Sequence, residues 1–153
     1  MITLTNKDVR EIVGEIELGL LPAYRKSDKK LIFIPDEERF DYDLDPDNPL
    51  PGQEELELID DNPDNYVIIN KWTSTAAYKF MEDFAEQEVN DLSLKNALLD
   101  ALSRNRPFAR FKDLIDRSPL REKWFEYEEK RMEEFIRKEF ETHPELEVAF
   151  KEE

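Results

Sequence analysis

Residues 94–140 read LKNALLDALSRNRPFARFKDLIDRSPLREKWFEYEEKRMEEFIRKEF, and this stretch decides the fold class. Apolar residues recur in it at the three- and four-residue spacing of a buried helix face. Pro107 suits the first turn of a short helix, and Ser118 followed by Pro119 has the form of a helix N-cap and its first residue. We therefore predict three helices, the last running from Ser118 to about Phe140.

Short β-prone runs lie upstream of these helices. Residues 23–26 and 31–34 flank a polar loop and predict a hairpin, and residues 66–69 supply a third strand. A lone hairpin is marginally stable in water, so the third strand is expected to pair with it in antiparallel fashion. Before the hairpin, the apolar spacing predicts a first helix that is capped by Thr5 or Asn6.

Together these elements predict an α+β fold. A small antiparallel sheet of about three strands is expected to pack against a mainly helical C-terminal half. A chain of 153 residues has the size of one ordinary domain. We therefore expect a single domain over residues 1–153, with the first helix, the sheet and an acidic loop in 1–70, a helical part in 71–145 and a tail in 146–153.

The composition limits the chemistry. The sequence has no cysteine, which excludes disulfides, thiolate nucleophiles and cysteine-ligated metals and suits a reducing cytosol. We expect a cytoplasmic protein, because no signal peptide precedes the first helix and no apolar run approaches the roughly 20 residues that span a bilayer. With 22 basic and 38 acidic residues the net charge is −16, which makes nucleic-acid binding unfavourable.

One segment departs from this acidic character. Residues 103–123 contain seven basic and three acidic residues, a net charge of +4. Four of the basic residues surround helix starts, where free backbone N–H groups also favour anions: Arg104, Arg106, Arg110 and Lys112. One interpretation is a site for a nucleotide or another anion, with Phe108 and Phe111 stacking on a base. We favour a structural interpretation, in which the phenylalanines belong to the core and the arginines neutralise carboxylates, including those of the acidic loop.

The last helix extends the structural interpretation. On a helical wheel Glu128 falls inside an apolar arc. The arc is formed by Trp124, Phe125, Met132 and Phe135. A carboxylate in such an arc is either a general acid or base, or the ion-pair partner of a cation. We favour an ion pair between Glu128 and Arg106 or Arg110. The resulting structural clasp consists of Phe108, Phe111, Trp124 and Glu128.

The most acidic segment, residues 35–65, contains 13 acidic residues and one basic residue. Four of its carboxylates have the spacing of an EF-hand calcium loop: Asp43, Asp45, Asp47 and Glu54. The sixth loop position is Asn48 before a proline instead of the usual glycine, which disfavours the required turn. We therefore expect a solvated loop without a metal or cofactor. Residues 53–59 are expected to form a short helix with Leu56 and Ile59 facing inward.

Residues 98–127, LLDALSRNRPFARFKDLIDRSPLREKWFEY, resemble a bacterial uncharacterised protein family, UPF0158. Its members share a leucine-rich helix, an R-x-x-F-x-x-F-K-like stretch, and a Trp-aromatic pair after a spacer. Here these are residues 98–102, residues 106–112, and Trp124 with Phe125. The hairpin, the acidic middle and the third strand upstream look similar too, whereas the proline within the RPFARF run departs from the pattern. The resemblance implies no known activity, substrate or cofactor.

We expect a cytosolic protein-interaction module that uses its acidic loop or the surface around Arg106 and Arg110. Two alternatives stay open: a binder of a nucleotide or other anion at residues 104–112, and a metal-dependent hydrolase that uses carboxylates of the acidic segment. The balance leans away from an enzyme, because the only histidine, His143, is expected to be exposed and there is no glycine-rich phosphate loop. The expected partner is a protein, not a nucleic acid or a membrane, and the oligomeric state is left open.

Overall fold

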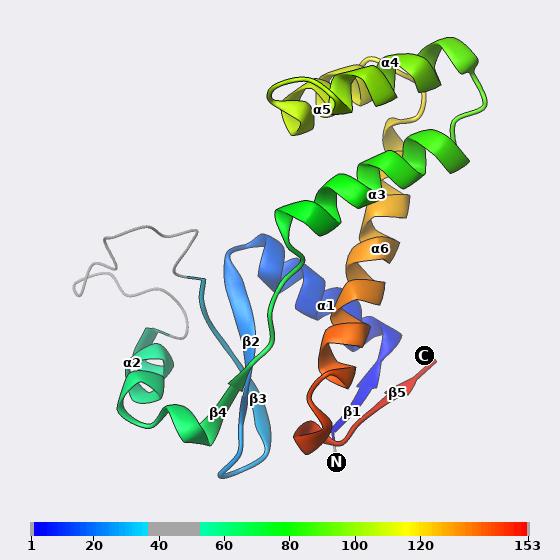
Figure 1. Ribbon diagram of the computed structural model, residues 1–153. Helices are drawn as coiled ribbons and strands as arrows, with labels where there is room; N and C mark the ends of the chain where they lie inside the picture. The colour runs from blue at the N-terminus through cyan, green and yellow to red at the C-terminus, as the bar shows by residue number, and fades with distance from the viewer. Residues whose placement is uncertain (1, 37–52, 153) are drawn as a thin grey trace. The chain divides into compact units, whose positions relative to one another are not determined.

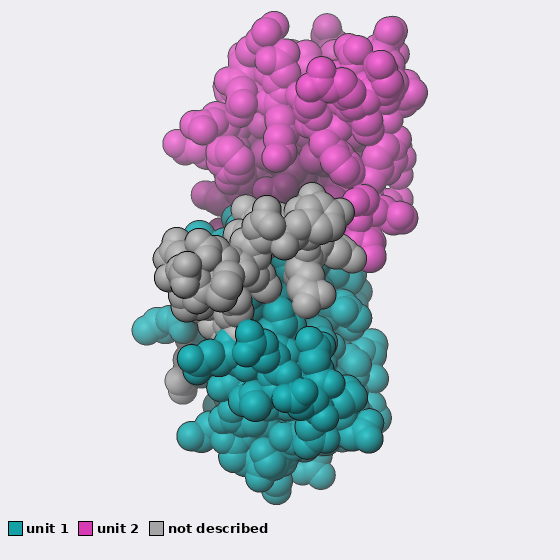
Figure 2. Space-filling view, turned by 90° about the vertical axis from the view of Figure 1, so that its left-hand side faces the viewer, with its two compact units in different colours: residues 1–71, 133–153 teal, residues 72–132 magenta. Residues whose placement is uncertain are grey.

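The computed structural model describes residues 2–36 and 53–152 (Figure 1). The chain divides into two compact units (Figure 2). Unit 1 contains residues 1–71 and 133–153, and unit 2 contains residues 72–132. The fold class is α+β, as predicted, and helices dominate the C-terminal half. The single domain over residues 1–153 stays a prediction.

Unit 1 contains the predicted antiparallel sheet. Its central strand is β2 (Leu20–Arg25), which lies between β3 (Lys30–Pro35) and β4 (Tyr66–Ile68). Ala23 of β2 is opposite Ile32 on one side and Ile68 on the other. The hairpin and the third strand are therefore confirmed.

The helix α2 (Gln53–Asp61) covers this sheet from the acidic segment. Its residues Leu56 and Ile59 are buried in one cluster with Ala23 and Ile34 of the sheet. The two side chains lie three residues apart, so a single helix face buries both. The predicted inward face of this short helix is confirmed. A turn of 3-10 helix, η1 (Pro63–Asn65), then leads into β4.

The first helix, α1 (Asn6–Glu17), begins as predicted. Thr5 caps it: the Thr5 hydroxyl accepts from the Asp8 N–H, and the Asp8 carboxylate accepts from the Thr5 N–H. This reciprocal pair satisfies two backbone donors that a bare helix start would leave free. The buried face consists of Val9, Ile12, Val13 and Ile16. After the C-cap residue, Gly19 has a φ of 100°, a left-handed backbone that glycine adopts without strain.

Unit 1 also holds a second, parallel sheet that the sequence does not predict. It consists of β1 (Ile2–Thr5) and β5 (Val148–Lys151), and Leu4 lies opposite Phe150. The Phe150 ring packs edge-to-face on Phe140, with 6.4 Å between ring centroids. The residues expected to form a tail therefore form a strand. It follows the short 3-10 helix η2 (Pro144–Leu146).

Unit 2 is helical. It contains α3 (Ser74–Gln87), α4 (Leu92–Leu102), α5 (Pro107–Asp116) and the first part of α6 (Arg121–Glu141). Thr73 and Asp91 cap α3 and α4 through their side-chain oxygens. No helix within residues 2–36 and 53–152 combines the length and apolar composition needed to cross a membrane.

The start of α6 differs from the prediction. The helix begins at Arg121, although Ser118 and Pro119 have the form of a cap and a first helical residue. The Ser118 hydroxyl does accept from the Leu120 N–H, but it also donates to the carbonyl of Ile115 at the end of α5. Ser118 therefore closes the turn between two helices, and regular α6 geometry begins after that turn.

Candidate functional site

The four predicted cations of the basic segment all lie exposed in unit 2. We call them the basic surface: Arg104, Arg106, Arg110 and Lys112. Arg104 and Arg106 belong to the connection between α4 and α5, and the other two lie on α5. No acidic residue occurs between Arg104 and Lys112, so this surface has a net charge of +4 in a chain of net charge −16.

The four cations differ in their contacts. The Nε of Arg104 lies 2.9 Å from the Asp100 carboxylate, and both side chains are largely exposed. Arg110 donates to the backbone and side-chain oxygens of Asn105, at 2.8 and 3.0 Å. In the described part of the chain, neither Arg106 nor Lys112 has a side-chain hydrogen bond or ion pair. Two cations are thus available to a partner, and a third is held in place by an uncharged neighbour.

The backbone at Arg106 is strained. Arg106 is the N-cap residue of α5 and has a left-handed conformation, with φ 53° and ψ 51°. A residue with a β-carbon disfavours this conformation, and a residue before proline prefers extended backbone. No side chain caps the helix start. The cations also lie at the positive end of the helix dipole, where negative charge would be favourable. The start of α5 therefore gives up stability in three separate ways.

Farther along the segment the charges are balanced locally. Arg117 pairs with Asp113 at 3.2 Å, and Arg121 pairs with Asp116 at 3.3 Å. All four side chains are well exposed, so each pair contributes little to stability. The unbalanced positive charge is consequently confined to the basic surface.

The residues of the predicted clasp lie at different depths. Phe111 and Trp124 are fully buried and pack edge-to-face, with 5.0 Å between ring centroids. Phe108 and Glu128 are half-buried. Because Phe111 is buried, its ring offers no face on which a nucleotide base could stack. Because Arg106 has no side-chain ion pair among the described residues, the predicted pairing of Glu128 is left to Arg110, and there it stays a prediction.

Phe125 corrects one part of the helical-wheel analysis. The wheel places it in the apolar arc of α6, yet the side chain is 45% exposed. The guanidinium of Arg121 lies over its ring, 5.1 Å from the centroid. The face that α6 buries is therefore narrower than the arc, and a cation covers the remaining aromatic surface.

A second group of charged residues in unit 2 joins two helices and has a structural role. Arg131 lies against the rings of Phe80 and Tyr127, 4.9 and 5.6 Å from their centroids, and donates to Asp83 at 3.0 Å. Asp83 also pairs with Lys79 at 3.1 Å. Burial alone would raise the pKa of Asp83, but hydrogen bonds from Lys79 and Arg131 outweigh it and lower that pKa. The network joins α3 to α6 and leaves its charges compensated.

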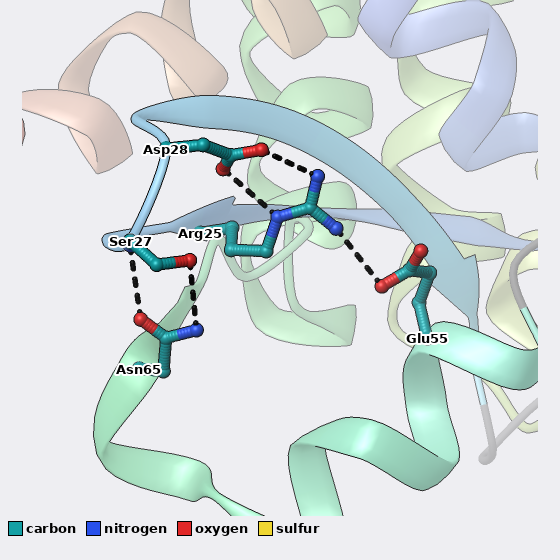
Figure 3. Close-up of polar contacts among 5 residues, drawn as sticks. All are labelled: Arg25, Ser27, Asp28, Glu55 and Asn65. Atoms are coloured by element: carbon teal, nitrogen blue, oxygen red, sulfur yellow. Dashed lines mark hydrogen bonds and ion pairs between the residues drawn. The ribbon is translucent and has the colours of Figure 1, made fainter.

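In unit 1, polar contacts pin α2 to the hairpin (Figure 3). Arg25 donates twice to the Asp28 carboxylate, at 2.8 and 2.7 Å, and once to Glu55 of α2, at 3.1 Å. The hydrogen bonds to Asp28 raise the pKa of Arg25 and lower that of Asp28. Beside them, Ser27 and Asn65 exchange two hydrogen bonds, at 3.0 and 3.2 Å. Arg25 therefore ties α2 to the hairpin, and Ser27 ties η1 to it.

The calcium-loop candidate falls mostly outside the described residues, which exclude Asp43, Asp45 and Asp47. Glu54 is exposed on the first turn of α2. Within residues 2–36 and 53–152, no three His, Cys, Asp or Glu side chains are grouped so as to hold a metal ion.

His143 is half-buried and not exposed as expected. The end of α6 and the turn of η2 enclose it, with Glu139 3.7 Å from one ring nitrogen and Glu145 3.8 Å from the other.

Comparisons with known proteins identify relatives of uncharacterised function. The sequence model of the Uncharacterised protein family (UPF0158) matches residues 18–153. A UPF0158 protein of Chlamydia trachomatis serovar D is 30% identical over 118 residues, which cover 72% of this chain and 34% of that protein. The chain thus spans about a third of the length of this curated relative. No solved structure matches the chain.

Proposed function

The chain belongs to the uncharacterised protein family UPF0158, and we propose that it is an interaction module that binds an acidic segment of a partner protein through the basic surface. The family is the one that residues 98–127 resemble, and it carries no activity to transfer. The proposal therefore rests on this chain's own residues.

The observation that carries the proposal is the lack of internal partners for Arg106 and Lys112 among the described residues. The chain has 38 carboxylates and only 22 Lys and Arg side chains. In such a chain an exposed cation readily finds a carboxylate, as Arg104, Arg117 and Arg121 do. Leaving Arg106 unpaired at a strained helix start, and Lys112 unpaired on the same helix, favours a role outside the folded chain.

The exposure of the four cations favours an extended partner. Small-molecule sites bury most of the ligand in a concave pocket, whereas these side chains lie open on a helix surface. An acidic peptide segment can place successive carboxylates against several cations, and arginine binds a carboxylate through two parallel hydrogen bonds. Nucleic acid carries a denser negative charge, which a protein of net charge −16 repels more strongly.

The test is calorimetric titration of the full chain with a hexaglutamate peptide at low ionic strength. The wild-type chain should bind it, and added salt should weaken binding because the contacts are exposed ion pairs. The double variant Arg106→Ala/Lys112→Ala should lose the binding. The matched control is Arg10→Ala/Lys130→Ala, which removes two exposed cations from elsewhere on the surface.

Both double variants have a net charge of −16 − 2 = −18, so a general charge effect would weaken binding equally in the two. Equal loss, or no binding by the wild-type chain, contradicts the proposal. A parallel titration with ATP tests the nucleotide alternative. Binding of ATP with silence towards hexaglutamate would replace the proposed function with that alternative.

A further inference from the structure

We propose that the acidic partner of the basic surface is the outer face of α2 in a second copy of this chain. This inference rests on the proposed function and adds the identity of the partner. The outer face of α2 consists of Glu54, Glu57, Leu58 and Asp61. The inference follows from the spacing of these residues, the contacts that hold α2, and the complementary charge of the basic surface.

The outer face has the spacing of a single helical stripe. Its four residues follow one another at three, one and three positions, so they share one side of α2. All four are exposed, and Leu58 retains 50% of its accessible surface. Among the described residues, the three carboxylates of the face make no hydrogen bond or ion pair. The face therefore offers a partner three unpaired carboxylates around one apolar side chain, which complement a surface of opposite charge.

The orientation of α2 is fixed before any partner binds. Leu56 and Ile59 anchor the inner face of the helix in the sheet cluster, and Arg25 holds Glu55 from the side (Figure 3). Binding therefore does not have to order this helix, which reduces the entropic cost of association.

The basic surface matches this face in charge and in shape. Ala109 is exposed on α5 between Arg106 and Arg110, and its small side chain leaves room for Leu58 of the other copy. If the two helices cross in antiparallel fashion, Glu57 meets Arg110 and Asp61 meets Arg106. Antiparallel helices also align their dipoles favourably. The contact then combines one apolar contact with two pairs of opposite charge, and it places Glu54 opposite Asp113, whose charge Arg117 compensates.

Repulsion between the copies opposes this contact. Each copy has a net charge of −16. At physiological salt the Debye length is about 8 Å, so charges spread over the surface are screened more than charges in direct contact. The association should accordingly be weak and reversible, and it should disappear at about 1 M salt, where the contact pairs are screened too.

Sedimentation equilibrium of the full chain tests the inference at physiological salt. The mass should rise above that of one copy as the concentration increases, and it should pass two copies unless the contacts close into a ring, because a contact between two different surfaces leaves one of each free. Charge reversal at either side, Arg110→Glu or Glu57→Arg, should weaken association roughly tenfold, because each converts an attraction into a repulsion. An equimolar mixture of the two variants should associate again. A monomeric wild-type chain, or a mixture no better than the single variants, would overturn the inference.

Cross-linking tests the register, since the chain has no cysteine of its own. One chain with Leu58→Cys and another with Ala109→Cys are mixed and oxidised with oxidised glutathione. A disulfide-linked pair of the two chains should form, in a yield that salt reduces. Lys7→Cys, exposed on α1, replaces Leu58→Cys as the control. Equal yields from the two mixtures would contradict the proposed contact.

These results separate the two proposals. If hexaglutamate binds at the basic surface and the chain remains a single copy at all concentrations, the second-copy inference fails and the proposed function stands. If hexaglutamate does not bind but the copies associate, association uses another surface and both proposals fail.

Discussion

Replacing Arg106 with glycine should stabilise the protein while weakening hexaglutamate binding. The left-handed backbone at φ 53° costs a residue with a β-carbon about 1–2 kcal/mol, and glycine avoids that cost. Glycine loses more backbone entropy on folding, which offsets about 0.5–1 kcal/mol of the gain. Removing a cation from the positive end of α5 adds a few tenths of a kcal/mol. The net gain should be about 1 kcal/mol.

Urea denaturation followed by tryptophan fluorescence measures this gain, because both tryptophans lie in unit 2 with Arg106. With a slope of about 2 kcal/mol per molar urea, a gain of about 1 kcal/mol raises the midpoint by roughly 0.5 M. Arg106→Ala removes the same cation but keeps the backbone strain, so its midpoint should stay near that of the wild type. The difference between the glycine and alanine variants isolates the backbone cost.

Lys29 provides a control, because its backbone is also left-handed but it lies outside the basic surface. It is exposed and also left-handed, with φ 59°, but it lies in the hairpin turn of unit 1. Lys29→Gly should stabilise unit 1 by a similar amount and leave hexaglutamate binding intact. If Arg106→Gly were no more stable than Arg106→Ala, the left-handed conformation would not be a source of strain. The start of α5 would then lose no stability through its backbone conformation.

Other contacts make predictions of their own. Asp83→Ala should destabilise unit 2 by about 2 kcal/mol in the same denaturation experiment, because it removes a charged hydrogen-bond partner from the half-buried Arg131; a change below about 0.5 kcal/mol would show that the network is only superficial. The pKa of Asp83 is lowered in the folded state, so its contribution to stability is present above about pH 4 and is lost as the pH falls through the folded-state pKa. The free energy of unfolding should therefore fall less steeply below about pH 4 in Asp83→Asn than in the wild type. Parallel curves for the two proteins would contradict a stabilising role of the Asp83 carboxylate. Arg25→Ala should speed hydrogen exchange in α2, while Lys26→Ala, one residue along the turn, should leave it unchanged.

The elements that could be predicted from sequence are those with local causes. Thr5 caps α1 through a reciprocal pair with a residue three positions on, and Pro107 starts α5 because its fixed φ suits a first turn. The inward face of α2 follows from the spacing of Leu56 and Ile59 within one short segment. Such signals involve residues a few positions apart, so a single sequence contains them.

The features that escaped prediction depend on distant residues or on backbone geometry. β1 and β5 pair across almost the whole chain, and each has only four residues, so neither segment by itself indicates its partner. The left-handed backbone of Arg106 leaves no mark either, since the following proline would predict an extended conformation. For the candidate site, the sequence predicts which cations belong to it. It does not predict which of them lack an internal partner.

The proposed function depends on which cations of the basic segment lack an internal partner. Of the cations in the basic segment, Arg104, Arg117 and Arg121 each have a carboxylate four or five positions away on the same or the neighbouring helix. Arg106 has no carboxylate at such a distance, and the carboxylate four positions from Lys112, that of Asp116, pairs with Arg121. One carboxylate placed near the start of α5 would stabilise the helix dipole and also pair a cation. The chain has 38 carboxylates but none at this position, and the proposed acidic partner would supply the negative charge there.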